Sequence, residues 1–576
     1  MSSNFTSRPV IVGRNGVVTS SHYLATLSGI RVLEKGGNAF DAAAAVGFSM
    51  AVLEPHMNSL GGEVPVIFYS AKEDRVVVVS GQGPAPQNAK IEWFKAQGLR
   101  LIPGDGFLPL VVPSMVATWI EILKRYGTMS LKEVASFALE LAENGIPMSS
   151  KLRDYILEYK ERFLKEWPTT AKTFLPNGKV PEINEIFVQP ELANTLRLLI
   201  EAERSASEYD RIAGLEAARS AFYEGIIAQK TSEFVQKPVL DASGKPHQGF
   251  ITEDDFARYK VKFEEPVCVN YGEYTVFKCG PWTQGPVFLQ QLNILEEFEL
   301  SKIGHNSADY IHLLVEAAKL AFADREKYYG DPEFDHVPLE TLLSKKYAAL
   351  QGNKIDMNCA SDLPIEGAEA NWEFEQKGGD TTHFDVIDKW GNMVSATQSG
   401  GWIWSSPLIE GLGFALSTRA QMFYLDPRRN NCLAPNKRPR TTLTPTLVYK
   451  NNKPFMIFGT PGGDQQDQWT LQFFLNYTTF GMNLQQALDA PSFHTLHFPS
   501  SFYPRRAHPK TVVIEDRVKS SVIEELRKRG HVVKLTGGWQ NGRLTAAVRD
   551  FEKGVLLAAA SPKADDGGST AYAFGW

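Results

Sequence analysis

The chain has 576 residues, of which 43% are hydrophobic and 22% charged, and its formal net charge is −6. These are the values of an ordinary globular protein that can bury a large core. The absence of a long basic run argues against nucleic acid or an anionic membrane surface as the main partner. No run of about 18 apolar residues occurs, so we expect no membrane span.

The N-terminal stretch MSSNFTSRPVIVGRNG has no charged start followed by an apolar run. We therefore expect no secretory signal and a cytoplasmic location. The cysteines are too far apart for a zinc pattern and too few for a disulfide framework, so we expect reduced thiols packed as small apolar side chains, and no metal. These cysteines are Cys268, Cys279, Cys359 and Cys432.

Residues 20 to 54 predict two helices. The first has Ser20 and Ser21 as candidate caps and ends at Gly36–Gly37. The second, AFDAAAAVGFSMAVLE, is rich in small residues that allow close packing against a sheet. Residues 64 to 81 then predict two strands joined by a turn.

The middle of the chain is mostly helical between residues 114 and 240, with loop material near 166 to 182. Strand patterns return from 262 to 280, and helices are expected near 286–299 and 307–328.

Residues 352 to 380 are polar and without periodicity, which is typical of an exposed tether. Three hairpins with alternating apolar positions follow: HFDVID with MVSATQS, TPTLVY with FMIFGT, and RLTAAVRD with VLLAAAS. Because strands and helices occur on both sides of residue 380, we expect one core shared across it rather than two independent domains.

Several common catalytic signatures do not occur. The chain has no G-x-S-x-G elbow, H-E-x-x-H motif, P-loop or G-x-G-x-x-G between a strand and a helix. A serine triad, a zinc hydrolase and a P-loop enzyme are therefore disfavoured. An unrelated α/β hydrolase or oxidoreductase stays a minor alternative, which a bound dinucleotide or metal would reveal.

The stretch GGDTTHFDVIDKWGN, residues 378 to 392, places Thr381 directly after a flexible Gly-Gly-Asp and at the start of a strand. A threonine hydroxyl is a weak nucleophile unless a base is adjacent, and the residue's own free α-amine is one such base. That amine titrates near pH 8, so a useful neutral fraction exists at neutral pH. The pattern is compatible with cleavage of the Asp380–Thr381 bond, but on this segment alone two β-branched residues that merely open a strand are the favoured interpretation.

Two further segments carry candidate chemistry. Pro461-Gly462-Gly463-Asp464 follows a predicted strand and opens a helix that Asp464 could cap, so its amides suit a developing oxyanion. The hydroxyls of Thr441 and Thr442 precede another strand and could bind a substrate carbonyl or carboxylate, or satisfy local backbone groups.

Together and in this order, TTHFDVIDKWGN, KRPRTTLTPTLV and FGTPGGD closely resemble the small subunit of the γ-glutamyltranspeptidases, which are N-terminal-nucleophile hydrolases. The resemblance extends to RVLEKGGNAFDAAAAVGFSMAVLEPHMNSLGG, FITEDDFARYKVKFEEPV and AAKLAFADREKYYGDP, and thus to nearly the whole chain. It implies a four-layer αββα sandwich. It also implies a large subunit, residues 1–380, and a small catalytic subunit, residues 381–576, that form one unit after autocleavage.

The resemblance assigns roles to individual residues. Thr381 corresponds to the nucleophile, and Ser399 to a hydroxyl residue close to its amine, where the family usually has threonine. Gly462 and Gly463 correspond to the oxyanion-hole amides. It implies no cofactor and no metal.

The substrate site departs from the family pattern. Thr441 and Thr442 stand where a Ser-Ser pair contacts the substrate. Gln82 lies where the family has an arginine for the substrate α-carboxylate, and the acidic residue that holds the α-amino group is absent while Arg419 is present. A glutamine does not replace a charged bidentate clamp at equal strength. Arg419 could offer a new anion contact or form a surface salt bridge.

The segment from Asp426 to Pro435 is short, which implies that the family's lid over the glutamyl pocket is missing. The main hypothesis is therefore a divergent, lid-less amidohydrolase that acts on a small-molecule amide or γ-glutamyl substrate, by hydrolysis or transfer. The alternative is a relative that binds a small molecule without turnover. Association of processed heterodimers into a homo-oligomer stays open.

Overall fold

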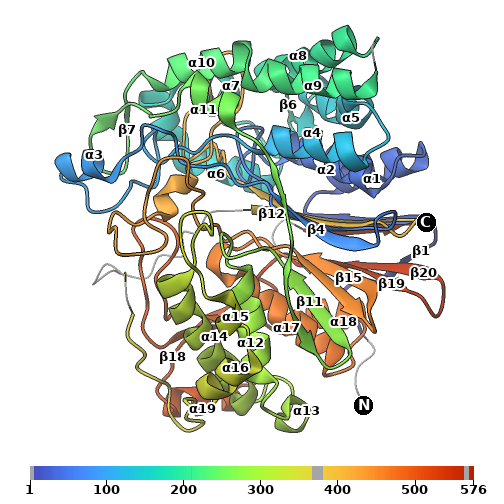
Figure 1. Ribbon diagram of the computed structural model, residues 1–576, viewed down its shortest axis with the longest axis vertical. Coiled ribbons are helices and arrows are strands. Elements are labelled where there is room, and N and C mark those ends of the chain that lie inside the picture. Colours follow the sequence, from blue (N-terminus) through green and yellow to red (C-terminus); the bar gives the residue numbers. More distant parts are fainter. Residues whose placement is uncertain (1–4, 209, 366, 368–380, 563–569) are drawn as a thin grey trace.

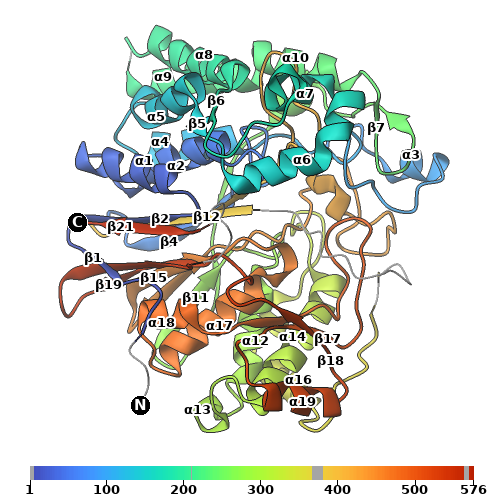
Figure 2. The same cartoon turned by 180° about the vertical axis from the view of Figure 1, so that it is seen from behind.

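The fold consists of two stacked sheets with helices on both outer faces. A computed structural model describes residues 5–208, 210–365, 367, 381–562 and 570–576. Two seven-stranded antiparallel sheets lie face to face in the middle of the molecule, with helical layers above and below (Figure 1; Figure 2). The αββα sandwich expected from the sequence is thereby confirmed.

Sheet I, which contains the strand that begins at Thr381, has the order β21-β2-β12-β13-β3-β4-β9. Its strands are β21 (Tyr572–Gly575), β2 (Gly16–Ser20), β12 (Thr381–Asp388), β13 (Met393–Ser399), β3 (Val66–Ser70), β4 (Arg75–Ser80) and β9 (Lys262–Glu264). The hairpin β12–β13 was predicted from its alternation and its Trp-Gly-Asn turn.

Sheet II has the order β1-β20-β19-β15-β14-β11-β10. Its strands are β1 (Ile11–Gly13), β20 (Val555–Ala560), β19 (Thr545–Asp550), β15 (Lys453–Gly459), β14 (Thr446–Lys450), β11 (Tyr274–Lys278) and β10 (Val267–Tyr271). Both sheets combine strands from before and after residue 380, as the shared-core prediction requires.

The helices that cover sheet I come from the first half of the chain (Figure 1). They are α1 (Tyr23–Glu34), α2 (Ala39–Leu53), α4 (Met115–Tyr126), α5 (Leu131–Asn144), α6 (Ser150–Lys165), α7 (Pro168–Phe174), α8 (Pro190–Ala206), α9 (Arg211–Tyr223), α10 (Ile226–Val235) and α11 (Glu253–Arg258). Helix α3 (Ile91–Ala96) lies to one side of the sheet and packs in a separate small cluster.

The helices on the side of sheet II come from two later segments. They are α12 (Gly285–Leu295), α13 (Leu300–Ile303), α14 (Ala308–Tyr328), α15 (Leu339–Leu342), α16 (Lys345–Gly352), α17 (Gln466–Thr478), α18 (Leu484–Asp489) and α19 (Ser520–Lys528). A small three-stranded sheet accompanies them, made of β16 (Phe493–Thr495), β17 (Thr511–Glu515) and β18 (Val532–Thr536). Two short two-stranded ribbons, β5 (Ile146–Pro147) with β6 (Ile186–Phe187) and β7 (Val239–Leu240) with β8 (Pro246–His247), lie among the first helices.

Alternation along β12 decides which side chains face the other sheet. Phe384 and Val386 belong to the core between sheet I and its helices, whereas Ile387 belongs to the core between the two sheets. Because side chains alternate with period two, Thr381 and His383 share the inter-sheet face with Ile387. A Cβ added to Gly459 at the end of β15 would come within 2.3 Å of the His383 ring, so the two sheets are closely packed here.

Three local predictions were wrong. The cap of α1 is His22, whose Nδ1 accepts from the Leu24 amide, while the Ser20 hydroxyl donates to the His22 carbonyl. Helix α7 forms where loop material was expected. Of the cysteines, all unpaired, only Cys279 is buried, and Cys268 and Cys359 are exposed, so the expected packing holds for one thiol.

The tether expected at residues 352 to 380 is only partly described. From Asn353 to Ile365 the chain carries no helix or strand and most residues are at least partly exposed, as expected, although Ala360 is buried. Asp380 and the residues before it from 368 lie outside the described residues. Among the helices of the described part, none is long and apolar enough to cross a bilayer.

Candidate active site

Thr381 is the first residue of β12 and is almost fully buried, with 1% of its surface exposed. It pairs across the ladder with Ser399, the last residue of β13. The Thr381 Oγ1 and Ser399 Oγ atoms are 3.1 Å apart, which is a hydrogen-bond distance. The structure therefore brings together these two residues, which the sequence analysis singled out 18 positions apart.

The Gly462–Gly463 turn follows β15 at the end of sheet II that faces the start of β12. Both glycines have a left-handed backbone, with φ of 126° and 56°. This conformation costs little for glycine and strains other residues. A Cβ on Gly462 would also come within 2.2 Å of the Trp469 ring, so no side chain fits there.

The expected capping role of Asp464 is wrong. A short 3₁₀ turn, Gly463–Gln465, precedes α17, and the cap position of α17 is Gln465 without a side-chain hydrogen bond. The Asp464 carboxylate instead accepts from the amide and hydroxyl of Ser501, at 2.8 and 2.6 Å, and pairs with Arg325. Asp464 thus ties the glycine turn to helix α14.

Arg325 is part of a buried group of charges around this turn. Its guanidinium contacts Glu326 at 2.8 Å, and Glu326 also pairs with Arg440 at 2.8 Å. Burial raises the pKa of the Glu326 carboxyl, but the charges of Arg440, Arg325 and Arg505 outweigh it and lower that pKa to about 2. The carboxylate is therefore ionised at neutral pH and balances the arginines.

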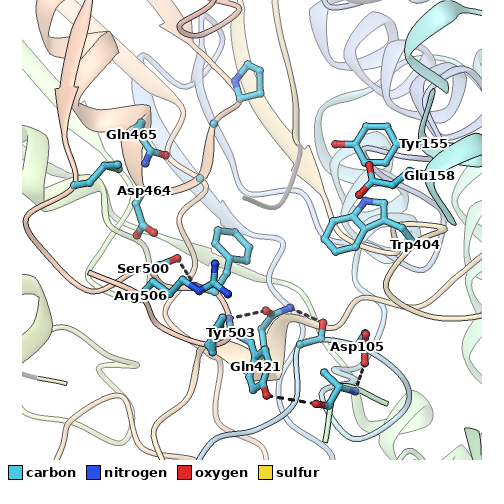
Figure 3. A pocket seen from close by; sticks show the side chains of 18 of the residues that line it. Asp105, Tyr155, Glu158, Trp404, Gln421, Asp464, Gln465, Ser500, Tyr503 and Arg506 are labelled. Carbon is cyan, nitrogen blue, oxygen red and sulfur yellow. Dashed lines mark hydrogen bonds between the residues drawn. The ribbon is translucent and has the colours of Figure 1, made fainter. Parts of the chain in front are cut away.

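A cavity of about 700 Å³ opens beside the glycine turn. Gly462 and Gly463 line it, together with aromatic side chains that include Tyr155, Trp404 and Phe502. Figure 3 shows Tyr155, Glu158 and Trp404 on one side of the space and Asp464, Gln465 and Arg506 across from them. A cavity of this size with mixed aromatic and charged walls is typical of a small-molecule site.

Arg419 links this cavity to the hydroxyl pair. Its Nη2 atom lies 2.9 Å from Ser399 Oγ, and its guanidinium carbon lies 5.7 Å from the centre of the Phe502 ring. A Cβ added to Gly463 would lie 3.0 Å from the same ring, so a chain of contacts through Ser399, Arg419 and Phe502 connects Thr381 to Gly463. Gln421, two residues after Arg419, lines the cavity.

Arg419 forms no surface salt bridge, because its side chain is fully buried. It pairs with Glu63, whose side chain is also fully buried, at 2.5 Å. Burial raises the pKa of the Glu63 carboxyl, and the neighbouring guanidinium opposes that shift. The sequence analysis did not single out Glu63, although it follows directly on the quoted stretch that ends in Leu-Gly-Gly.

The three other predicted substrate residues are buried close to the strands. Thr441 accepts weakly from the Leu443 amide, at 3.4 Å, and the Thr442 hydroxyl has no hydrogen-bond partner among the described residues. Gln82 donates to the Gly83 carbonyl at 3.1 Å, and its Oε1 atom is likewise without a partner in the described part. Within that part, Gly462 and Gly463 are the predicted site residues that line the cavity.

One group of side chains has the composition of a metal site. His312, Glu316 and His531 are buried and place their ligand atoms within 4.8 Å of one another. The two imidazoles bond to each other at 2.8 Å, and Glu316 pairs with Lys319 at 2.7 Å. These contacts satisfy the facing atoms without an ion, and none of the three residues lines the cavity.

Comparison with known proteins groups the chain with a family of hydrolases. The chain matches the family described as Gamma-glutamyltranspeptidase over residues 25–572. It is 34% identical to the "Glutathione hydrolase-like YwrD proenzyme" of Bacillus subtilis (strain 168) over 559 residues, which are 96% of this chain and 98% of the relative.

Two solved structures share the whole fold. One, named LmbA2991HD, has 41% sequence identity and a TM-score of 0.94, covering 99% of this chain and 100% of its own. The cephalosporin acylase from Bacillus halodurans has 29% identity and a TM-score of 0.84, covering 100% and 98%. The similar proteins thus include both a glutathione hydrolase-like proenzyme and a cephalosporin acylase.

Proposed function

Because the chain belongs to the γ-glutamyltranspeptidase family of hydrolases, we propose that it is an amidohydrolase precursor that cuts itself at Asp380–Thr381 and uses Thr381 as an N-terminal nucleophile. The observation that carries the proposal is the hydroxyl pair of Thr381 and Ser399, 3.1 Å apart, which Arg419 and the Phe502 ring connect to the Gly462–Gly463 turn. Residues 1–380 and 381–576 then form the two subunits.

The reaction follows from these groups. The Thr381 α-amine, freed by cleavage, accepts the Oγ1 proton while Oγ1 attacks the substrate carbonyl. The Gly462 and Gly463 amides stabilise the oxyanion, since amides in a glycine turn are fixed donors. The amide C–N bond breaks, the leaving amine takes the proton, and water hydrolyses the ester on Thr381. Transfer to an acceptor amine would replace only the last step.

The acyl group is expected to differ from the γ-glutamyl group. Gln82 offers one amide where a guanidinium would clamp a carboxylate, and Arg419 is already paired with Glu63. The cavity walls carry Tyr155, Trp404 and Phe502, which suit an apolar or aromatic acyl chain. We propose a small-molecule acyl amide as substrate, with γ-glutamyl compounds as poor ones. The cytoplasmic location and the need for no cofactor are parts of the same proposal.

The test is mass spectrometry of the purified protein and of its Thr381→Ala variant. The wild type should give two chains of 380 and 196 residues, and the variant a single uncut, inactive chain. Incubation with aryl-acetyl and γ-glutamyl anilides should produce an acyl adduct on Thr381 with the former at the higher rate. A cut and active Thr381→Ala protein would refute the proposal.

A further inference from the structure

The buried Arg419 guanidinium contacts two polar side chains, those of Glu63 and Ser399. Its Nε atom lies 2.6 Å from Glu63 Oε1, and its Nη2 atom lies 2.5 Å from the same oxygen and 2.9 Å from Ser399 Oγ. A guanidinium has donors only. Arg419 therefore donates to both partners, and the Ser399 oxygen accepts.

Donation by a cation changes what the Ser399 hydroxyl can do. An oxygen that accepts from a guanidinium becomes a weaker acceptor for other groups, and its own O–H becomes a stronger donor, because hydrogen bonds in a chain polarise one another. The Thr381 oxygen, 3.1 Å away, is positioned to receive that donation. All three side chains are buried, where such effects are larger than in water.

The surrounding backbone holds this arrangement in place. Glu63 and Ser399 exchange two backbone hydrogen bonds, each 2.9 Å long, so the carboxylate and the hydroxyl have a fixed relation. Gly400 has φ of 78°, and a Cβ there would come within 2.4 Å of Glu63 Oε2. The glycine after Ser399 thus leaves room for the Glu63 carboxylate.

We propose that Arg419 is a positioning residue that orients the Ser399 hydroxyl as a donor to Thr381 Oγ1, with Glu63 holding and neutralising the guanidinium. The inference rests on the proposed function, in which Thr381 is the nucleophile. As the Thr381 proton moves to the α-amine, negative charge grows on Oγ1 until its bond to the acyl carbon forms. The Ser399 hydrogen bond stabilises that charge, and Arg419 acts only through Ser399.

A double-mutant cycle tests this path. The ion pair is removed as a unit in Glu63→Gln/Arg419→Met, so that no single buried charge is left behind, and the same pair of changes is made in a Ser399→Ala background. In the otherwise wild-type protein, we expect Glu63→Gln/Arg419→Met to lower kcat about tenfold or more, because the variant loses one charge-assisted hydrogen bond. In the Ser399→Ala background the same change should alter kcat less than about twofold. KM should stay within about twofold in both.

Two further variants separate positioning from general stability. Arg419→Lys keeps a cation that can make only some of the Arg419 contacts. Its kcat should therefore lie between that of the wild type and that of Glu63→Gln/Arg419→Met. Lys319→Met/Glu316→Gln removes a different buried ion pair, and should lower the thermal midpoint without changing kcat. If a variant does not cleave itself fully, the rate of its self-cleavage at Asp380–Thr381, followed on a denaturing gel, replaces kcat as the readout. This is possible because Thr381 Oγ1 is also the attacking atom in the proposed self-cleavage.

Equal losses of kcat in the wild-type and Ser399→Ala backgrounds would overturn the inference, since Arg419 would then act without Ser399. A rise in KM at constant kcat would also overturn it, in favour of a direct substrate contact. These outcomes differ from failure of the proposed function, in which the wild type itself forms no acyl adduct on Thr381.

Discussion

Gly462 shows at the scale of one residue how the backbone serves the proposed chemistry. Its φ of 126° and the Trp469 ring within 2.2 Å of a built Cβ leave no conformation for alanine. We predict that Gly462→Ala moves the turn and lowers kcat about a hundredfold or more, the usual effect of losing an oxyanion donor. Steady-state kinetics on the acyl-amide substrate would measure the loss.

Gly530 provides the matched control, because its φ is 91° and the space around it is open. Gly530→Ala should cost about 1–2 kcal/mol of stability from backbone strain and leave kcat unchanged. If Gly462→Ala had the same kinetics as Gly530→Ala, the glycine turn would not form the oxyanion site.

Asp464 belongs to the scale of elements, because it joins the turn before α17 to Arg325 on α14. Without the Asp464 carboxylate, Arg325 keeps only Glu326, which Arg440 shares, so the buried group carries one unbalanced positive charge. Unbalancing a buried charge in this way typically costs about 3–5 kcal/mol. We predict that Asp464→Asn lowers the free energy of unfolding by about that amount and reduces kcat, since the turn loses its anchor. Urea denaturation and kinetics would measure both.

The matched control for Asp464 is Asp426→Asn. Its partner, Arg428, has 87% of its side chain exposed, so water screens this pair and its loss should change the stability little. Similar destabilisation by the two substitutions would show that the buried contact of Asp464 adds nothing.

How far the sequence predicts this structure differs between elements. The three hairpins after residue 380 were expected because period-two alternation and turn residues are local signals. The cap of α1 was predicted wrongly because the His22 side chain, and not a serine hydroxyl, accepts from the Leu24 amide. The sequence pattern does not show which of these neighbouring side chains makes that hydrogen bond. Glu63 and Arg419 are 356 residues apart, so only the fold shows that the arginine is buried and paired.

At the scale of the whole molecule, both sheets combine strands from either side of the proposed cleavage site. In sheet I, β12 and β13 of the predicted small subunit lie side by side between β2 and β3 of the predicted large subunit. We predict that the processed chains elute together in native size-exclusion chromatography and separate only in denaturant. Residues 381–576 expressed alone should be insoluble, because β12 would lose β2, and β13 would lose β3. Separation of the chains in native buffer would contradict this.

The charge group around Glu326 links the fold's stability to pH. Its pKa is lowered to about 2 in the folded state and is about 4.3 in an unfolded chain, so the folded carboxylate binds protons less readily. This contribution, on the order of 3 kcal/mol, is fully present above about pH 4.5 and is lost as the pH falls toward 2. We predict that Glu326→Gln destabilises the protein strongly at pH 7 and that its difference from the wild type shrinks between pH 4.5 and 2. Denaturant midpoints across that range would show it, and a difference independent of pH would mean that packing, not charge, sets the role of Glu326.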